Sequence, residues 1–385
     1  VMQLNKVNEV NTTRVLQQIW LSGGTTRVAI ARDLGLVKST VSRIVTMLLE
    51  RGLIRETSWE QKTGVGRTPV RLEVNEKYGI VIGLELQTDF FNALATDLNG
   101  EVLRTWSGSI SMSGKDTITG FFEIMERLEP WIVSCGAPLI GVGVAFAGQV
   151  DQSRGVILQS NPLNIFEPVP FVREVQHRTA VPVLIENDAN CGCWGELVSR
   201  KTLRHSNFVF VLGEFRTGET EQDLYWGIAI GLGLVLNGEV YHGASYSAGE
   251  FQSILWRPGN EGQLSISNDE ARRIKEDRAI MTAAFHELCA HVAFLVNTLN
   301  LTNVVFGGEI ADFREMLVPI LDAEIQKNWS YPNRVEYTVE FSEKNTYAVA
   351  YGAAGMFLES IYTIPDMFSE AGSATQHEIS VLGER

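Results

Sequence analysis

One segment of the chain gathers the side-chain types that proteins use to read DNA. Residues 38–50 carry apolar side chains at the spacing of one helix face, and small polar and basic side chains stand at the start of the segment. Short Ser and Thr side chains allow a close approach to base edges, and a guanidinium can reach a base or a phosphate. The candidate DNA-contacting residues are Thr26, Lys38, Ser39, Thr40, Ser42, Arg43 and Arg67.

A second group of polar side chains occurs at residues 186–190. The Asp188 carboxylate can accept hydrogen bonds from two hydroxyl groups, and the Asn187 amide both donates and accepts. Such groups are suited to anchor a sugar. The alternative is that Asn187 and Asp188 only cap a helix that begins near Ala189.

The cysteines and histidines are not spaced as metal ligands. Cys191 and Cys193 lie two positions apart on a predicted helix, about 200° around its axis, so their thiols do not converge. His286 and His291 have one residue too many between them for a His-Glu-x-x-His site. We expect packing or surface roles for all four.

Three short helices must position the candidate DNA contacts. Apolar residues at helical spacing in 15–20 predict the first helix. Thr25 or Thr26 can cap a second helix, whose expected inner face includes Val28, and Gly35 suits its C-terminal end. A third helix over residues 38–50 then completes a helix-turn-helix. The alternative is a helical hairpin that binds no nucleic acid.

Two short strands follow these helices, at residues 53–56 and 70–74, with a polar loop between them. This pattern predicts a wing, and thus a winged helix-turn-helix domain over residues 1–77. Arg67 at the loop tip could enter a narrow minor groove, where the negative potential is strongest. Its alternative role is that of a solvated loop residue.

The charge of the chain is unevenly distributed. Residues 1–78 contain 12 Lys and Arg against 7 Asp and Glu, a net charge of +5, whereas residues 79–385 contain 20 against 39, a net charge of −19. A basic front on an acidic body suggests that only the front meets a polyanion. A chance fluctuation of surface charge is the alternative.

The composition excludes several classes of protein. The chain of 385 residues is 45% hydrophobic and has four cysteines, which is ordinary for a globular protein and no disulfide framework. We find no secretory signal pattern and no apolar run of the length that crosses a bilayer. We therefore expect a cytoplasmic protein.

The body predicts two related α/β lobes. Strands at 80–86, 91–97 and 101–109 precede a helix at 115–134 and a buried strand at 140–146. A second series repeats this order, with strands at 208–212, 225–230 and 232–236, a helix near 280–299 and a strand at 303–306. A cleft between two lobes is the natural place for a ligand.

The order of motifs along nearly the whole chain resembles the ROK family of repressors, open reading frames and kinases, in its repressor branch. The motifs are Ile30-Ala31 with Ser39–Ser42, the wing segment Gly66–Pro69, the glycine segment 141–148, Glu186–Asn190, the segment 231–244, Ala248–Glu250 and Phe306–Gly308. The resemblance implies an actin-like, ribonuclease-H-like α/β fold. It divides the chain into residues 1–77, a first lobe at 78–185 completed by a helix near 345–362, a second lobe at 186–344, and a tail at 363–385.

The resemblance also implies where a sugar would bind. Asp188 matches the residue that takes a proton from the sugar hydroxyl in the kinases of the family, and the other implied ligand contacts are Gln149, Asn161, Asn187 and Glu250. The matches of Gln149 and Asn161 are loose, and hydrogen bonding within loops is an equal alternative for both.

Two departures from the family pattern bear on chemistry. The segment that cradles phosphates in the kinases reads Glu85–Phe90 here and has no glycine, so we expect ATP binding to be lost and the chain not to be an enzyme. Ser253 replaces a common His, and the stretch 254–263 lacks the cysteines of the family's structural zinc segment, so we expect no zinc cofactor.

The sequence thus predicts a regulator, most simply a repressor, that binds operator DNA as a homodimer or dimer of dimers and responds to a sugar or polyol. One alternative is a sugar kinase with an added DNA-binding domain, which Asp188 and Gly307-Gly308 favour. Another is a regulator controlled by a protein partner, for which Ser253 and the absent zinc segment leave room.

Overall fold

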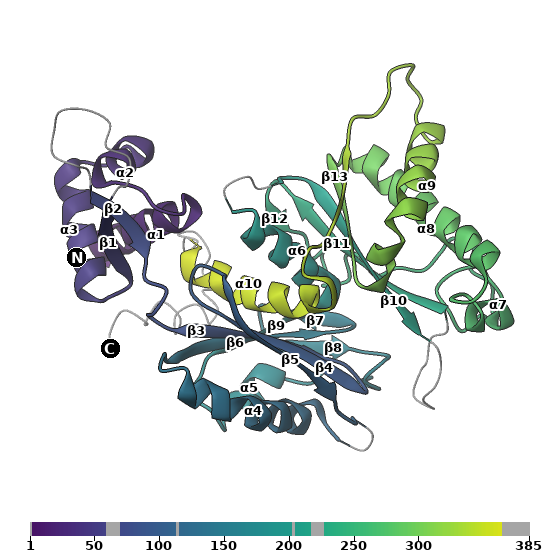
Figure 1. Ribbon diagram of the computed structural model, residues 1–385, viewed down its shortest axis with the longest axis horizontal. Coiled ribbons are helices and arrows are strands. Elements are labelled where there is room, and N and C mark those ends of the chain that lie inside the picture. Colours follow the sequence, from purple (N-terminus) through teal and green to yellow (C-terminus); the bar gives the residue numbers. More distant parts are fainter. Residues whose placement is uncertain (1, 59–69, 113–114, 202–204, 217–226, 364–385) are drawn as a thin grey trace.

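The computed structural model describes residues 2–58, 70–112, 115–201, 205–216 and 227–363. Figure 1 shows an N-terminal unit of helices and a small hairpin, followed by two α/β lobes. We call these the winged unit, the first lobe and the second lobe. The helix α10 (Ala348–Tyr362) returns to lie on the sheet of the first lobe (Figure 1).

The winged unit has the elements that the sequence predicts. Its helices are α1 (Met2–Leu21), α2 (Arg27–Leu34) and α3 (Lys38–Glu50), and its strands β1 (Ile54–Ser58) and β2 (Val70–Val74) pair antiparallel. Thr26 caps α2, because its hydroxyl accepts a hydrogen bond from the backbone N–H of Ala29 at 3.2 Å. Gly35 ends the helix in the left-handed region at φ 63°.

The expected inner face of α2 is wrong at one position. Val28 is 65% exposed, whereas Ile30 and Ala31 are buried against the core of the winged unit. On α3 the expectation holds, since Val41, Ile44, Val45 and Leu48 are all buried.

The first lobe is a five-stranded sheet in the order β5-β4-β3-β6-β9. Its strands are β3 (Ile80–Leu86), β4 (Phe90–Thr96), β5 (Val102–Ser109), β6 (Leu139–Phe146) and β9 (Val183–Asn187). The helices α4 (Thr117–Ser134) and α5 (Phe171–Gln176) cover one face, and α10 (Ala348–Tyr362) covers the other (Figure 1). A small hairpin of β7 (Gln149–Asp151) and β8 (Val156–Gln159) lies beside β9.

The second lobe repeats this plan with the order β12-β11-β10-β13-β14. Its strands are β10 (Phe208–Arg216), β11 (Gly227–Leu236), β12 (Glu239–Val240), β13 (Asn303–Gly307) and β14 (Thr338–Phe341). Its helices are α7 (Asn268–Arg272), α8 (Arg278–Leu299) and α9 (Arg314–Lys327). The sequence predicts two strands within 225–236, and this is wrong, because β11 is one strand whose residues 227–235 pair with β10 without a break.

Among the described residues, α8 is the one helix long and apolar enough to cross a membrane. Its buried side chains, which include Phe285, Leu288, Cys289 and Val292, form part of the hydrophobic core of the second lobe. The helix is thus accounted for as a core element of this lobe.

The two lobes are joined through a close crossing of α6 (Asp188–Ser199) with α10. Glycines line the crossing on both sides: an added Cβ on Gly352 would overlap the backbone carbonyl of Cys191, and one on Gly195 would lie 3.4 Å from the Cα of Gly352. The helices therefore pack backbone against backbone. Gly83 on β3 and Gly143 on β6 allow α10 to pack equally closely on the sheet, because an added Cβ would overlap the carbonyls of Ala350 and Ala353, respectively.

The winged unit shares a hydrophobic core with the end of α10. The rings of Trp20 on α1 and Tyr362 on α10 stack with centroids 4.3 Å apart, and both side chains are fully buried. The Tyr362 hydroxyl donates to the Leu98 carbonyl at 3.0 Å, and the Lys201 ammonium lies 5.3 Å from the Trp20 ring centroid. The winged unit is thus fixed to the C-terminal helix by its first helix.

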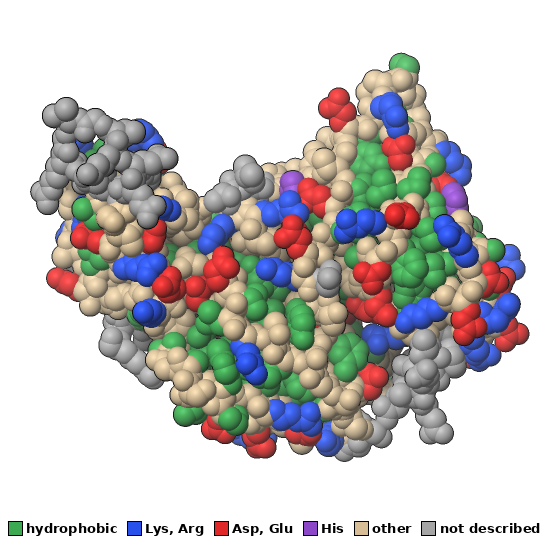
Figure 2. All heavy atoms as spheres, in the orientation of Figure 1, with side chains coloured by type: hydrophobic (Ala, Val, Ile, Leu, Met, Phe, Trp, Pro, Cys, Tyr) green, Lys and Arg blue, Asp and Glu red, His purple; other side chains and the backbone are tan. Residues whose placement is uncertain are grey.

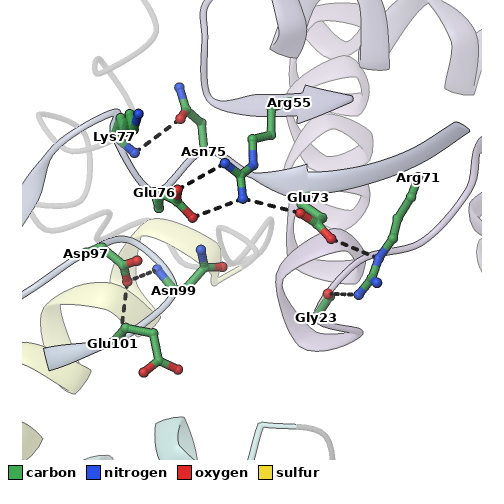
Figure 3. A network of polar contacts seen from close by, with 10 residues as sticks. All are labelled: Gly23, Arg55, Arg71, Glu73, Asn75, Glu76, Lys77, Asp97, Asn99 and Glu101. Atoms are coloured by element: carbon green, nitrogen blue, oxygen red, sulfur yellow. Dashed lines mark hydrogen bonds and ion pairs between the residues drawn. The ribbon is translucent and has the colours of Figure 1, made fainter. Parts of the chain in front are cut away.

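A polar network holds the segment that connects the winged unit to the first lobe (Figure 3). The Arg55 guanidinium donates two hydrogen bonds of 3.0 Å to the carboxylate of Glu76 and lies 3.5 Å from that of Glu73. Arg71 links Glu73 to the carbonyl of Gly23. These contacts connect both strands of the wing with the connecting segment, in addition to the apolar contact at Trp20.

Candidate functional site

The predicted DNA contacts lie at the start of α3 and at the cap of α2. Lys38, Ser39 and Ser42 are exposed, and Thr40 is half-buried. The hydroxyl of Thr26 is used as the cap of α2. Arg67 lies outside the described residues. Figure 2 shows that the winged unit and the second lobe stand on either side of a concave edge of the molecule.

Arg43 is exposed but has a partner within the protein. Its guanidinium donates a hydrogen bond of 2.8 Å to the Asn8 side chain on α1. The hydrogen bond between two exposed side chains is weak enough to exchange for a phosphate or a base. Asn8 therefore holds Arg43 on the α1 side of α3.

A pocket between the two lobes collects four of the five predicted ligand contacts. Asn161, Asn187, Asp188 and Glu250 line it together, while Gln149 is not among its lining residues. Gln149 instead opens β7, with its backbone paired to Gln159 in the small hairpin. The remaining walls come from the turn after β3, from β10 and β11, and from loops of both lobes. They are formed by Gln87, Thr88, Ala147, Gly148, Pro162, Leu212, Glu214, Arg216, Ala229, Ile230, Gly231, Leu232, Ala248, Gly249 and Gln263.

Asn187 serves as the N-cap of α6. Its side-chain oxygen accepts from the Asn190 N–H at 3.0 Å, and its amide donates to the Gly148 carbonyl and to Asp188 Oδ1, both at 3.0 Å. Asn187 therefore caps the helix and also lines the pocket. Asp188 is the first residue of α6; its Oδ1 also accepts from the Ala189 N–H at 2.8 Å, and its Oδ2 has no hydrogen bond within the described part of the chain. That oxygen is available to accept a hydrogen bond in the pocket.

Two charged residues of β10 complete the pocket, and sequence reasoning missed both. Glu214 and Arg216 alternate with apolar neighbours on the strand and line the pocket together with Asp188. Glu85, buried beneath them on β3, accepts hydrogen bonds from Gln87 at 3.2 Å and Asn92 at 3.0 Å. The signal in the sequence is a pair of charged residues two positions apart, at the end of an otherwise apolar strand.

Burial raises the pKa of each carboxyl group in this cluster. The pKa of Glu85 is raised to about 7 by burial, against the effect of its hydrogen bonds from Asn92 and Gln87. Burial raises the pKa of Asp188 to about 6, although the Ala189 N–H and Arg216 favour its ionised form. Burial together with the negative charges of Glu85 and Glu309 raises the pKa of Glu214 to about 8. The pocket therefore holds exchangeable protons near neutral pH.

This proton retention predicts a falling stability with rising pH. Between about pH 5 and pH 8 the folded chain keeps protons that the unfolded chain has released, so the free energy of unfolding decreases as the pH rises through this window. Glu214→Gln cannot ionise, and we expect the decrease to be shallower in this variant. Urea unfolding at pH 5, 6, 7 and 8 measures it, with the exposed Glu129→Gln as the matched control. An identical slope in Glu214→Gln and wild type would contradict the assignment.

Glu186 anchors the back of the site without facing it. It is fully buried and accepts hydrogen bonds from Asn190 at 3.2 Å, Trp194 at 3.4 Å and His242 at 2.7 Å. Desolvation lowers the pKa of His242, but the hydrogen bond and the charge of Glu186 outweigh it, so the pKa of His242 is raised. This pair connects the loop after β12 to the end of β9.

Side-chain hydrogen bonds brace the stretch 254–263, where the family resemblance would place zinc ligands. The side-chain amide of Gln263 accepts a hydrogen bond from the Ile230 N–H at 2.6 Å and donates one to the Ile230 carbonyl at 2.8 Å. It also donates to the Phe251 carbonyl at 2.8 Å. The Trp256 indole donates to the Gly262 carbonyl at 2.9 Å, and Ser253 is bonded to His291 at 3.0 Å. Gln263 thereby fixes this stretch to β11 at the pocket wall.

Comparison with known protein families gives two matches. A family model described as "ROK family" matches residues 81–261, and one described as "Winged helix-turn-helix DNA-binding" matches residues 10–55. The chain is 29% identical over 245 residues to the xylose repressor of Bacillus subtilis (strain 168), a match that covers 63% of this chain and 60% of that protein. It thus spans less than two thirds of that relative. A putative xylose repressor of Caldicellulosiruptor sp. is 25% identical and covers 94% of this chain and 98% of its own length.

Solved structures show the same fold. A ROK family transcriptional regulator, described as a homolog of the E. coli MLC protein, superposes with a TM-score of 0.72 at 19% identity and covers 98% of this chain and 99% of its own. A ROK family glucokinase from Streptomyces griseus, in complex with glucose and AMPPNP, gives a TM-score of 0.55 at 18% identity over 72% of this chain and 99% of its own. The kinase match covers less of this chain than the regulator match does.

Proposed function

We propose that the chain is a DNA-binding transcriptional repressor of sugar-utilisation genes, since a winged helix-turn-helix model matches residues 10–55 and a ROK family model matches residues 81–261. The observation that carries the proposal is the shared core between the winged unit and α10, which joins a DNA-reading element to a lobed unit with a polar pocket. Relatives named as xylose repressors support it.

The effector in this proposal is a sugar bound between the lobes. Asp188 Oδ2 accepts one hydroxyl, and Glu250 and Asn161 offer further polar contacts from the other walls. In this proposal Asn187 does not contact the sugar. Its side-chain amide donates a hydrogen bond to Asp188 Oδ1 and so orients the Asp188 carboxylate. Since relatives are named for xylose, a pentose is the first effector to test. Gln149 is retained only as a contact that would require movement of β7.

We further propose that the chain does not act as a sugar kinase. An added Cβ on Gly308 would overlap the Glu214 carboxylate, so this side chain lies against the loop that would hold a nucleotide in a kinase of the family. The segment 85–90 adds side chains where phosphates need free backbone N–H groups. A phosphate chain would meet a carboxyl group at Glu214 and no glycine cradle.

Signal transmission in this proposal follows packed helices. The pocket residue Asp188 opens α6, α6 crosses α10 at Gly352, and α10 ends at the Tyr362–Trp20 stack. Sugar binding closes the lobes, moves α10, and shifts the winged units of two copies relative to each other on a two-part operator. We propose the boundaries 1–77, 78–185 with 345–362, and 186–344 for these parts, with a cytoplasmic, homodimeric or dimer-of-dimers protein.

The test begins with operator DNA selected from random duplexes by the full-length chain. Fluorescence anisotropy at fixed salt then measures binding while xylose and other monosaccharides and polyols are added one at a time, since phosphate contacts make the affinity salt-dependent. We expect one sugar to weaken the complex. Binding that no sugar changes would point to a protein partner or a phosphorylated sugar, and the absence of any selected duplex would overturn the proposal. ADP release from ATP with a sugar panel would revive the kinase alternative.

Asp188→Asn is expected to weaken sugar binding by about 10- to 100-fold, because one charge-assisted hydrogen bond contributes about 1.5–3 kcal/mol. Operator binding should stay unchanged, because Asp188 lies in the interlobe pocket and not in the winged unit. Isothermal titration with the active sugar and anisotropy with the operator measure the two effects. Asp269→Asn, on the exposed surface of α7, is the control. Equal sugar affinity in Asp188→Asn and wild type would contradict the assignment.

A further inference from the structure

One residue at the start of the recognition helix has no structural reason to be apolar. Val37 is the N-cap of α3 and is 70% exposed, so its side chain contributes little to the core. It makes no side-chain cap hydrogen bond, although Ser, Thr, Asp or Asn at this position would stabilise the helix. The neighbouring helix α2 follows that rule with Thr26. Neither packing nor capping therefore explains Val37.

The surroundings of Val37 are suited to a groove of DNA. The side chains beside it on the exposed face of α3 are Lys38, Ser39 and Ser42, which are charged or small. Of the large apolar side chains exposed in the described part of the winged unit, Val37 belongs to the recognition helix, while Val28 belongs to α2 and Val70 to β2. The sequence up to residue 78 carries a net charge of +5, which complements a polyanion.

The major groove offers one apolar group at base edges, the C5 methyl of thymine. The second helix of a helix-turn-helix enters this groove with its N-terminal residues, whereas the first helix crosses the backbone. Val37 stands at the end that enters, and an exposed isopropyl group there can cover a methyl group and remove both from water.

We propose that Val37 reads thymine, by packing against its C5 methyl group at one position in each half of the operator. This inference rests on the proposed function, since it names what the DNA-binding surface recognises. It assigns sequence preference to an apolar contact, while Lys38 and the small polar residues of α3 hold the helix in the groove.

The test compares thymine with uracil, which differ only in this methyl group. In the operator selected by the full-length chain, each symmetric pair of thymines is replaced by uracil in turn, and anisotropy measures the affinity of wild type, Val37→Ala and Val28→Ala. Loss of one buried methyl contact corresponds to about fourfold in affinity. For wild type we expect one of the thymine pairs to be sensitive to uracil, with this loss of affinity for each of its two methyl groups that is removed. Val37→Ala should lose less than twofold there, and Val28→Ala should behave as wild type.

A second variant separates recognition from folding. Val37→Ser supplies the missing cap, so we expect it to be at least as stable as wild type in thermal unfolding, yet to bind the operator more weakly and without sensitivity to uracil. If no uracil pair affects wild type, or if Val37→Ala and wild type lose the same factor at every pair, the inference is wrong while the proposed function stands. If no duplex is selected at all, the proposed function itself fails.

Discussion

Gly352→Ala is expected to destabilise the protein by about 3 kcal/mol or more, the upper end of what overpacking of a close contact costs. An alanine Cβ at this position on α10 would overlap the carbonyl of Cys191 on α6, and neither backbone can move without displacing a lobe. The small gain in helix propensity of alanine, about 1 kcal/mol, does not offset this overlap. Urea unfolding followed by circular dichroism measures the loss.

The facing position provides a matched control. Gly195→Ala on α6 would place its Cβ 3.4 Å from the nearest atoms of α10, an ordinary contact. Both glycines lie inside helices and gain the same propensity, so we expect Gly195→Ala to be within about 1 kcal/mol of wild type. If both variants were equally stable, α6 and α10 would not be packed as closely at Gly352 as we describe.

Trp20→Ala is expected to cost about 3–5 kcal/mol, as the removal of a fully buried tryptophan does. The loss is apolar, because the Trp20 indole N–H has no hydrogen-bond partner in the described structure. Since Trp20 also belongs to the core of the winged unit, Tyr362→Ala tests the contact from the other side. In Tyr362→Ala we expect operator binding to persist and the effect of the sugar on it to be lost.

Tyr362→Phe is the conservative control for this contact. It keeps the stacked ring and removes the hydrogen bond to the Leu98 carbonyl, which contributes about 1 kcal/mol. Its sugar response should therefore stay close to that of wild type. Thermal unfolding and operator titration with and without sugar distinguish these outcomes. A full sugar response in Tyr362→Ala would exclude the stack from signal transmission.

The winged unit could be predicted from sequence because its signals are local. The apolar stripe of α3 has a period of 3.6 residues, and Thr26 and Gly35 mark the ends of α2. Val28 was misplaced because α2 has only eight residues, too few for the period to identify one face. In the second lobe, the sequence predicts separate strands at 225–230 and 232–236, which leaves Gly231 between them. Gly231 lies within β11, where an added Cβ would come to 3.1 Å from that of Ala189.

The site could be predicted only where a motif carried it. Asp188 and Glu250 lie in recognisable segments, and both line the pocket. Glu214 and Arg216 carry no motif. They lie on β10, paired with Ala229 and Gly227 of β11, and line the pocket together with residues of the first lobe. Gln149 matched the family only loosely, and the hairpin with β8 accounts for its position. Local sequence patterns do not show which strands pair when those strands are far apart in the chain.

The return of α10 to the first lobe also sets an order of events during synthesis. The strands of the first lobe begin at Ile80, yet the helix that covers one face of their sheet ends at Tyr362. A nascent chain leaves the ribosome from its N-terminus, at about 5–20 residues per second. One face of this sheet therefore stays uncovered until nearly the whole body has been translated. Trp20 likewise lacks its stacking partner Tyr362 until that point. An incomplete chain therefore lacks the helix that connects the pocket to the winged unit, and only a chain translated through Tyr362 can link the two.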